Sequence, residues 1–383
     1  MPPRIYLDNA ATSWPKPESV YASVEGFLRD IGAAAGRGGY GAAVQADKIV
    51  SDARSVVRAL LGAASTKSIL FTFNGTDALN TVIHGCLSAG DHVITTDLEH
   101  NSVLRPLSFL RAKLGIDITY IGCDERGLVE PKDVAVALRP GTRLVIVSHA
   151  SNVTGAIQPV AAIANRLEGH EALFLVDAAQ TVGHCPVDIT QLGADAVAAS
   201  GHKGMLGPLG TGVLYMGSRA IERVASFRQG GTGSLSEETN QPWELPDKYE
   251  SGNLNVAGLA GLGAGCQYLL ERGIDTVRGH LERLDERLID QFDDLTNVKL
   301  FGPLDPADRC GVTSFCVNGY PPQDVAAILD ASFGIQVRAG LHCAPRMHQA
   351  LGTLETGGTV RVSVGPFNTE SDIAALVGAL RQL

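Results

Sequence analysis

The chain has 383 residues, of which 45% are hydrophobic and 19% charged, and its formal net charge is −10. This composition is typical of a folded globular protein, and the charge excludes a general electrostatic attraction to nucleic acid or to an anionic membrane. No apolar run reaches the roughly 18 residues of a membrane span, and the N-terminus lacks the basic-then-apolar pattern of a signal peptide, so we expect a cytoplasmic protein.

Short apolar runs alternate with helix-period stretches through the first two thirds of the chain. These runs predict strands at Ile69–Phe73, His92–Thr96, Asp117–Ile121, Arg143–Ser148, Ala172–Asp177, Asp195–Ser200 and Thr211–Met216. Strands that alternate with helices predict an α/β fold whose mostly parallel sheet is covered by helices on both faces. Ligands of such sheets gather at the carboxyl ends of the strands.

The character of the sequence changes at residues 230–253, which are polar, rich in turn residues and longer than an ordinary connection. A long amphipathic stretch follows, then strands near residues 312–317 and 359–364 and a final helix from about Glu370. We therefore expect a large domain at 15–257 and a small α+β domain at 258–383. The segment 1–14 is expected to pack near the small domain and the active site.

Two charged residues stand at the ends of neighbouring predicted strands. Asp177 ends one strand, and Lys203 follows the end of the next. Alone, Asp177 fits a helix cap or a structural ion pair, and Lys203 fits a solvated surface lysine. Together they suit pyridoxal phosphate, which binds a lysine as a Schiff base and needs an acid beside its pyridine nitrogen.

A phosphate group on such a cofactor needs donors. The Gly75-Thr76 turn before a predicted helix offers backbone amides, and Ser200 and His202 lie in the same "SGHKG" loop as Lys203. A plain helix cap at Thr76 is compatible with this interpretation.

Two further loops fit the same site. His100 follows a predicted strand, where its ring could stack on the pyridine, although a solvated loop histidine fits equally well. Asn152 follows the strand that ends at Ser148, where its amide could donate to the phenolic oxygen of the ring or simply form a turn.

The motifs "YLDNAAT", "NGTDALN", "LEHNS", "SNVTG", "VDAAQ", "SGHKG" and "RAGLHCAP" occur in this order between Tyr6 and about Asn368. In this combination the chain closely resembles the short-loop cysteine desulfurases of the class V aminotransferase group. The resemblance implies an aspartate-aminotransferase-like fold, with a seven-stranded sheet in the large domain and a smaller C-terminal domain. It also implies pyridoxal 5′-phosphate as cofactor and a homodimer.

The same resemblance assigns a role to each matching residue. Lys203 becomes the Schiff-base lysine, Asp177 the pyridinium partner and His100 the stacking residue. Asn152 and Gln180 address the ring oxygen, Gly75, Thr76, Ser200 and His202 hold the phosphate, and Arg361, Asn152 and Ala11 bind the substrate. Cys343 becomes the nucleophile that takes sulfur from L-cysteine, leaving alanine and an enzyme persulfide for a thiol acceptor.

Cys343 differs from the other six cysteines because it stands in a polar loop, whereas they lie mostly in or beside apolar segments. We expect His342 and Arg338 to supply the cationic or donor groups that favour its thiolate. The seven cysteines are scattered without a CxxC pair, so neither a disulfide framework nor a metal site is expected.

One position departs from the family pattern. Asn253 stands in "ESGN", where the family often has a threonine that reaches the phosphate of the partner subunit; asparagine can also donate. The alternatives are a selenocysteine lyase, a class V aminotransferase or other pyridoxal lyase in which Cys343 is incidental, and a sulfur-transfer scaffold without catalysis. The acceptor could serve iron–sulfur assembly, tRNA thiolation or another pathway.

Overall fold

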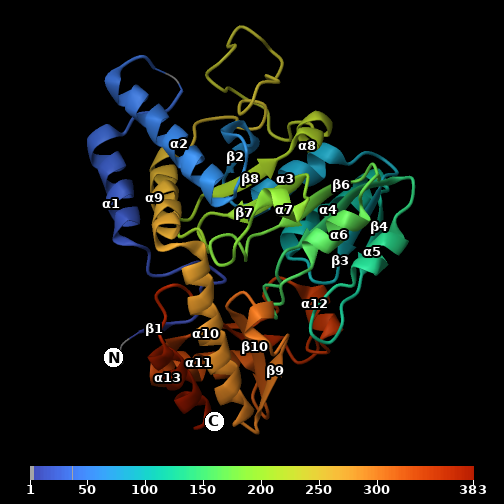
Figure 1. Ribbon diagram of the computed structural model, residues 1–383, viewed down its shortest axis with the longest axis vertical. Coiled ribbons are helices and arrows are strands. Elements are labelled where there is room, and N and C mark those ends of the chain that lie inside the picture. The colour runs from blue at the N-terminus through green and yellow to red at the C-terminus, as the bar shows by residue number, and fades with distance from the viewer. Residues whose placement is uncertain (1–3, 37) are drawn as a thin grey trace.

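The computed structural model describes residues 4–36 and 38–383. Its upper part in Figure 1 is built on a seven-stranded sheet of order β2-β8-β7-β6-β5-β3-β4. The strands are β2 (Ile69–Thr72), β3 (His92–Thr96), β4 (Asp117–Ile121), β5 (Thr142–Ser148), β6 (Leu173–Asp177), β7 (Ala196–Ser200) and β8 (Gly212–Met216). Only β8 runs antiparallel to its neighbours, β2 and β7. All seven predicted strands and the mostly parallel sheet are confirmed.

Successive residues of the central strands point to opposite faces of this sheet, and both faces are covered. In β5, for example, Leu144 and Ile146 belong to one hydrophobic cluster, and Val145 and Val147 belong to the other. Helices α3 (Gly75–Cys86), α4 (Asn101–Leu114) and α8 (Ser218–Arg223) contribute to the first cluster. Helices α2 (Gly41–Leu60), α5 (Pro131–Ala137), α6 (Val160–Arg166), α7 (Ile189–Leu192) and α9 (Val256–Arg272) contribute to the second. Helix α1 (Glu18–Gly26) packs on α9.

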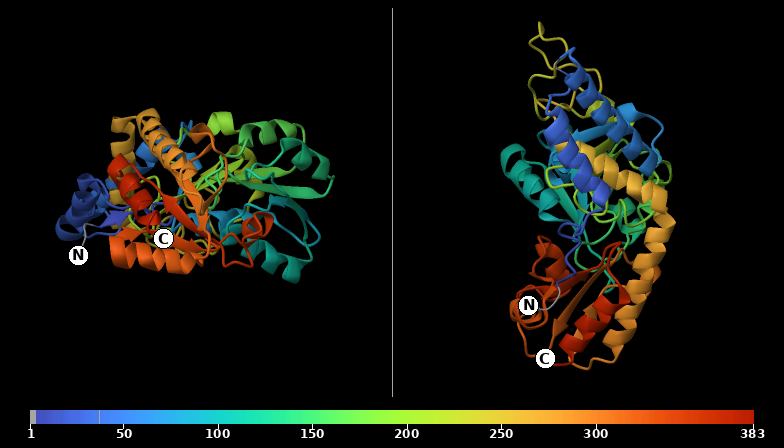
Figure 2. Two further views of the ribbon diagram at one scale, coloured as in Figure 1. Left: turned by 90° about the horizontal axis from the view of Figure 1, so that it is seen from below. Right: turned by 90° about the vertical axis from the view of Figure 1, so that its left-hand side faces the viewer.

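The lower part of the molecule contains a four-stranded antiparallel sheet of order β12-β13-β10-β9. Its strands are β9 (Val298–Phe301), β10 (Val312–Val317), β12 (Arg338–Gly340) and β13 (Thr359–Ser363). The helices of this part are α10 (Ile274–Asp293), α11 (Pro322–Phe333), α12 (Pro345–Ala350) and α13 (Glu370–Leu380). Figure 2 shows α9 and α10 running in succession from the upper part to the lower one. The predicted boundary at 257 and 258 falls in the first turn of α9 and stays a prediction.

The N-terminal segment crosses between the two parts. Strand β1 (Ile5–Tyr6) pairs in parallel with β11 (Ile335–Gln336), and Asp8 forms a bridge with Ser363. Five residues further along, the backbone amide of Ser13 donates to the carbonyl of His202, 3.0 Å away. Within the described residues, no helix is both long and apolar enough to cross a membrane.

Residues 230–253 form no helix or strand and include the loop at the top of Figure 1. The end of this segment is tied to the large sheet by a buried ion pair. Arg54 of α2 donates from Nη1 and Nη2 to the two carboxylate oxygens of Glu250, at 2.7 and 2.8 Å, and the amide of Phe71 in β2 donates to Glu250 Oε1 at 2.6 Å. This single carboxylate therefore joins a helix, an edge strand and the long loop.

We expect Glu250→Ala to lower the free energy of unfolding by about 3 kcal/mol, because it leaves the Arg54 guanidinium buried without its anion. Urea unfolding measures the change. Arg29→Ala is the control, since the Arg29–Glu25 pair is exposed and contributes little. Equal effects of the two substitutions would contradict the assigned role of Glu250.

Candidate active site

A cavity of about 300 Å³ opens where β5, β6 and β7 end, and Ser148, Asp177 and Ser200, the last residues of these strands, line it. All the site residues expected from the sequence except Asn253 and Cys343 line this cavity: Ala11, Gly75, Thr76, His100, Asn152, Asp177, Gln180, Ser200, His202, Lys203 and Arg361. The carboxyl ends of parallel strands meet at one edge of the sheet, which explains why residues far apart in the sequence converge here.

Asp177 and Lys203 form the charged floor of the cavity. Burial raises the pKa of Asp177, and this is opposed by the amide of Ala179, which donates to Oδ1 at 3.0 Å, and by the charge of Lys203. Burial lowers the pKa of Lys203 to about 8; Asp177 opposes this shift, and the guanidinium groups of Arg361 and Arg338 add to it. An amine that loses its proton near pH 8 can act as a nucleophile or a base close to neutrality.

The start of α3 forms a cradle for an anion. The side chain of Asn74 accepts from the amide of Asp77 at 2.9 Å. The amides of Gly75 and Thr76, the first two residues of the helix, have no intrahelical partner. A Cβ added at Gly75 would lie 2.5 Å from Oγ of Ser200, so only glycine leaves this space open. Nδ1 of His202 is buried without a partner among the described residues. These donors fit a phosphate group.

His100 is held as a neutral ring at the start of α4. The amide of Ser102 donates to Nδ1 of His100 at 3.1 Å, and because an amide can only donate, the proton of the neutral ring lies on Nε2. Burial and the charges of Lys203 and Arg338 lower the pKa of His100 to about 4. Oγ of Ser102 lies 2.7 Å from both Nδ1 of His100 and Oγ1 of Thr76, so it joins the ring to the cradle. Ser102 was not among the site residues expected from the sequence, although its place two residues after His100 at a helix start was the available signal.

Two arginines from adjacent strands face the other side of the cavity. Arg361 of β13 and Arg338 of β12 are direct cross-strand partners, and both line the cavity. Nη2 of Arg361 contacts Oδ1 of Asp8 at 2.7 Å, Nη1 donates to the carbonyl of Asn152 at 3.1 Å, and Nε has no partner among the described residues. Like charges opposite each other are unfavourable, and Asp8 supplies a single carboxylate, so this wall suits a second anion such as the carboxylate of an amino acid. Asp8 was not among the site residues expected from the sequence.

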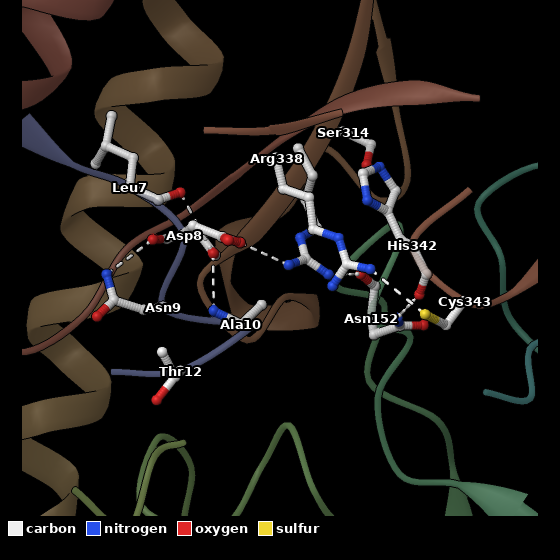
Figure 3. A network of polar contacts seen from close by, with 12 residues as sticks. Leu7, Asp8, Asn9, Ala10, Thr12, Asn152, Ser314, Arg338, His342 and Cys343 are labelled. Atoms are coloured by element: carbon white, nitrogen blue, oxygen red, sulfur yellow. Dashed lines mark hydrogen bonds and ion pairs between the residues drawn. The ribbon is translucent and has the colours of Figure 1, made fainter. Parts of the chain in front are cut away.

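Cys343 lies outside the cavity, in an adjoining hollow that shares Thr76, His100 and Ser102 with it. Figure 3 shows its sulfur beside Arg338, whose Nη2 donates to Sγ at 3.4 Å. Arg338 is therefore placed to donate to the thiol, and its expected effect on the thiolate stays a prediction.

The role expected for His342 is wrong. Its side chain is buried, and Nε2 lies 3.1 Å from the carbonyl of Thr359, so the ring packs into the small sheet rather than against the neighbouring thiol. Burial and nearby Arg361 lower the pKa of His342 to about 2, which excludes a cationic ring. Its backbone contributes instead, since its carbonyl accepts from Nδ2 of Asn152 at 2.6 Å.

Two of the remaining expected site residues, Gln180 and Asn253, have side-chain amides. Nε2 of Gln180 donates to the carbonyl of Ala10 at 3.3 Å, and Oε1 of Gln180 is buried without a partner among the described residues. Asn253 lines a separate, smaller hollow with Phe73 and Arg228. Its expected contact is with a second subunit, so that role stays a prediction.

The family model for aminotransferase class V matches residues 5–376. The chain belongs to the class V aminotransferase family. It is similar to a probable cysteine desulfurase from Methanothermobacter thermautotrophicus, with 37% identity over 99% of this chain and 94% of that protein. A cysteine desulfurase from Yersinia pestis is 32% identical over 100% of this chain and 93% of its own length.

The chain is also similar to solved structures of cysteine desulfurases. The apo structure of a cysteine desulfurase from Thermococcus onnurineus has a TM-score of 0.92 and 34% identity, covering 99% of this chain and 94% of its own. The Escherichia coli cysteine desulfurase CsdA has a TM-score of 0.87 and 30% identity, covering 98% and 94%. The expected fold, a large mostly parallel sheet with a smaller domain, is therefore confirmed.

We expect Gly75→Ala to weaken the binding of pyridoxal 5′-phosphate to this class V protein about ten-fold, because the new methyl group enters the space beside Ser200. Titration of cofactor-free protein, followed by the yellow colour of the lysine-bound cofactor, measures the affinity. Gly378→Ala is the control, since a Cβ at that position meets nothing within 4 Å. Unchanged affinity in Gly75→Ala would show that the cradle does not hold the phosphate.

Proposed function

We propose that this protein is a pyridoxal 5′-phosphate-dependent cysteine desulfurase, which converts L-cysteine to L-alanine and holds the sulfur as a persulfide on Cys343. The observation that carries the proposal is the arrangement of Arg338, which lines the cavity beside Lys203 and Arg361 and also contacts Sγ of Cys343 at 3.4 Å. The desulfurases to which the chain is similar over nearly its full length support the same activity.

The residues of the cavity fit the cofactor group by group. Lys203 would bind its aldehyde carbon, Asp177 its ring nitrogen, and the start of α3 with Ser200 and His202 its phosphate. His100 would lie against the ring, and Asn152 and Gln180 would approach its oxygen. When bound, pyridoxal phosphate supplies an electron sink for the α-carbon of an amino acid.

The protein's own residues would then carry out four tasks. Arg361 binds the substrate carboxylate through its planar guanidinium. The Lys203 amine, which is neutral above about pH 8, accepts the α-proton. Arg338 stabilises the Cys343 thiolate, which attacks the substrate sulfur: an S–S bond forms as the C–S bond breaks. The electron pair of the C–S bond goes to the β-carbon, which takes a proton, and the α-carbon regains the proton that it lost, so that alanine results. A thiol acceptor removes the outer sulfur.

Several finer points belong to the same proposal. We expect a homodimer in which Asn253 reaches the phosphate bound by the partner subunit, and a protein acceptor that passes the sulfur to iron–sulfur cluster assembly. The binding of Ala11 to substrate is expected through its place in the cavity wall. The cytoplasmic location and the predicted boundary between the two domains also remain predictions.

We expect Cys343→Ala to lower the formation of alanine from L-cysteine by at least 100-fold, since a positioned nucleophile is lost. Alanine and, with a thiol reductant, sulfide are measured for the enzyme loaded with cofactor. Cys123→Ala is the matched control, because Cys123 is also partly exposed but lies in a different hollow. Consumption of L-cysteine by Cys343→Ala at the wild-type rate would instead favour a lyase or aminotransferase in which this thiol is incidental.

A further inference from the structure

The carbonyl oxygen of His202, the residue before Lys203, lies within hydrogen-bond distance of four donor groups. The N-terminal segment supplies its donors: the amide of Ser13 at 3.0 Å, Oγ of Ser13 at 3.1 Å, Oγ1 of Thr12 at 3.1 Å and Nζ of Lys16 at 3.0 Å. Oγ of Ser13 also lies 2.9 Å from the carbonyl of Lys203 itself. Both peptide groups beside Lys203 are thus held by three residues of the N-terminal segment.

Lys16 is the charged member of this group. Its Nζ lies 2.7 Å from Oγ of Ser13, so the hydroxyl accepts from Lys16 and donates to the carbonyls beside Lys203. Within the described residues, Nζ of Lys16 contacts Oγ of Ser13 and the carbonyl of His202, neither of which is a carboxylate, and burial lowers the pKa of Lys16 to about 8. A partly buried cation without an anion is costly, and the cost falls when an anion binds nearby. The loop that it contacts contains His202, which faces the anion cradle.

The same segment also reaches the opposite wall of the cavity. Asp8 contacts Arg361, and the amide of Ala10 donates to Oγ of Ser363 at 2.8 Å. Figure 3 shows Asp8, Ala10 and Thr12 following one another along this segment. The segment therefore fixes the position of Lys203 relative to the small sheet that carries the arginines.

We propose that Lys16 is a positioning residue for Lys203: through Ser13 and the His202 carbonyl, its ammonium fixes the loop that holds the cofactor. This inference rests on the proposed function, because it needs a cofactor bound to Lys203. Lys16 does not line the cavity, so it acts through the loop and does not touch substrate. Its charge also favours the phosphate anion that this loop receives.

The test compares Lys16→Met with Lys16→Arg, which keeps a cation and several donors, and with Lys67→Met, a charge loss at an exposed lysine. We expect Lys16→Met to weaken the binding of pyridoxal 5′-phosphate to cofactor-free protein about ten-fold. In the loaded enzyme, kcat falls by a similar factor while KM for L-cysteine changes less than about two-fold, because Arg361 is untouched. Lys16→Arg restores most of both losses, and Lys67→Met changes neither.

Ser13→Ala supplies a second, independent measurement. If Lys16 acts in part through Ser13, the double variant loses less than the sum of the two single losses, since both changes break the bond between Nζ of Lys16 and Oγ of Ser13. Should Lys16→Met not fold, reduced affinity in Ser13→Ala still supports the proposal, and wild-type affinity overturns it.

Two further results would overturn the inference: wild-type affinity and kcat in folded Lys16→Met, or strictly additive losses in the double variant. Both results would leave the desulfurase proposal intact. A wild-type protein that binds no pyridoxal phosphate would overturn the proposed function itself, and the positioning role with it. The two failures are therefore distinguishable from the wild-type titration alone.

Discussion

Burial of the Lys203 amine is the constraint on which the rest of the site depends. Removing an ammonium group from water is unfavourable, and Asp177 is the carboxylate whose charge most opposes the resulting fall in its pKa to about 8. Asp177 is itself buried, and its pKa rises. Each group thus limits the cost of burying the other. The consequence is an amine that is reactive near neutral pH and held in a cavity whose shape the sheet determines.

The positive charge around that amine explains why the opposite wall is built as it is. Arg361 and Arg338 lower the pKa of Lys203 further, and Asp8 is the carboxylate that contacts Arg361. Cations concentrated in a buried site favour anionic ligands, and the cavity has two places for them, at the start of α3 and beside the arginines. A phosphate at the start of α3 and a carboxylate beside the arginines would neutralise these positive charges, whether the two anions belong to one ligand or to two.

Local patterns in the sequence were sufficient for the sheet and for most of the cavity. Strand-end residues such as Asp177 and Ser200 converge because parallel strands end at one edge, so their proximity follows from order along the chain. The contacts of Asp8, Ser13 and Lys16 could not be found in this way, because they depend on how an irregular segment crosses from the small sheet to the large one. The role expected for His342 was wrong for a related reason. Adjacency to Cys343 does not fix the direction of its ring. The two residues have left-handed backbone, with φ of 48° and 61°, and the ring of His342 contacts Thr359 of the small sheet.

The hydrogen bonds around Cys343 indicate how sulfur would leave the protein. The carbonyl of Cys343 accepts from the amide of Asn101 at 2.7 Å, and the carbonyl of His342 accepts from Asn152, so both ends of this short turn are attached to the large domain. With Sγ also bound by Arg338, the loop is fixed at three points close to the cavity. A thiol held in this way cannot carry its sulfur far. Under the proposed function, the acceptor would approach Cys343 instead, at the hollow beside α4 that Arg105 and Phe109 also line.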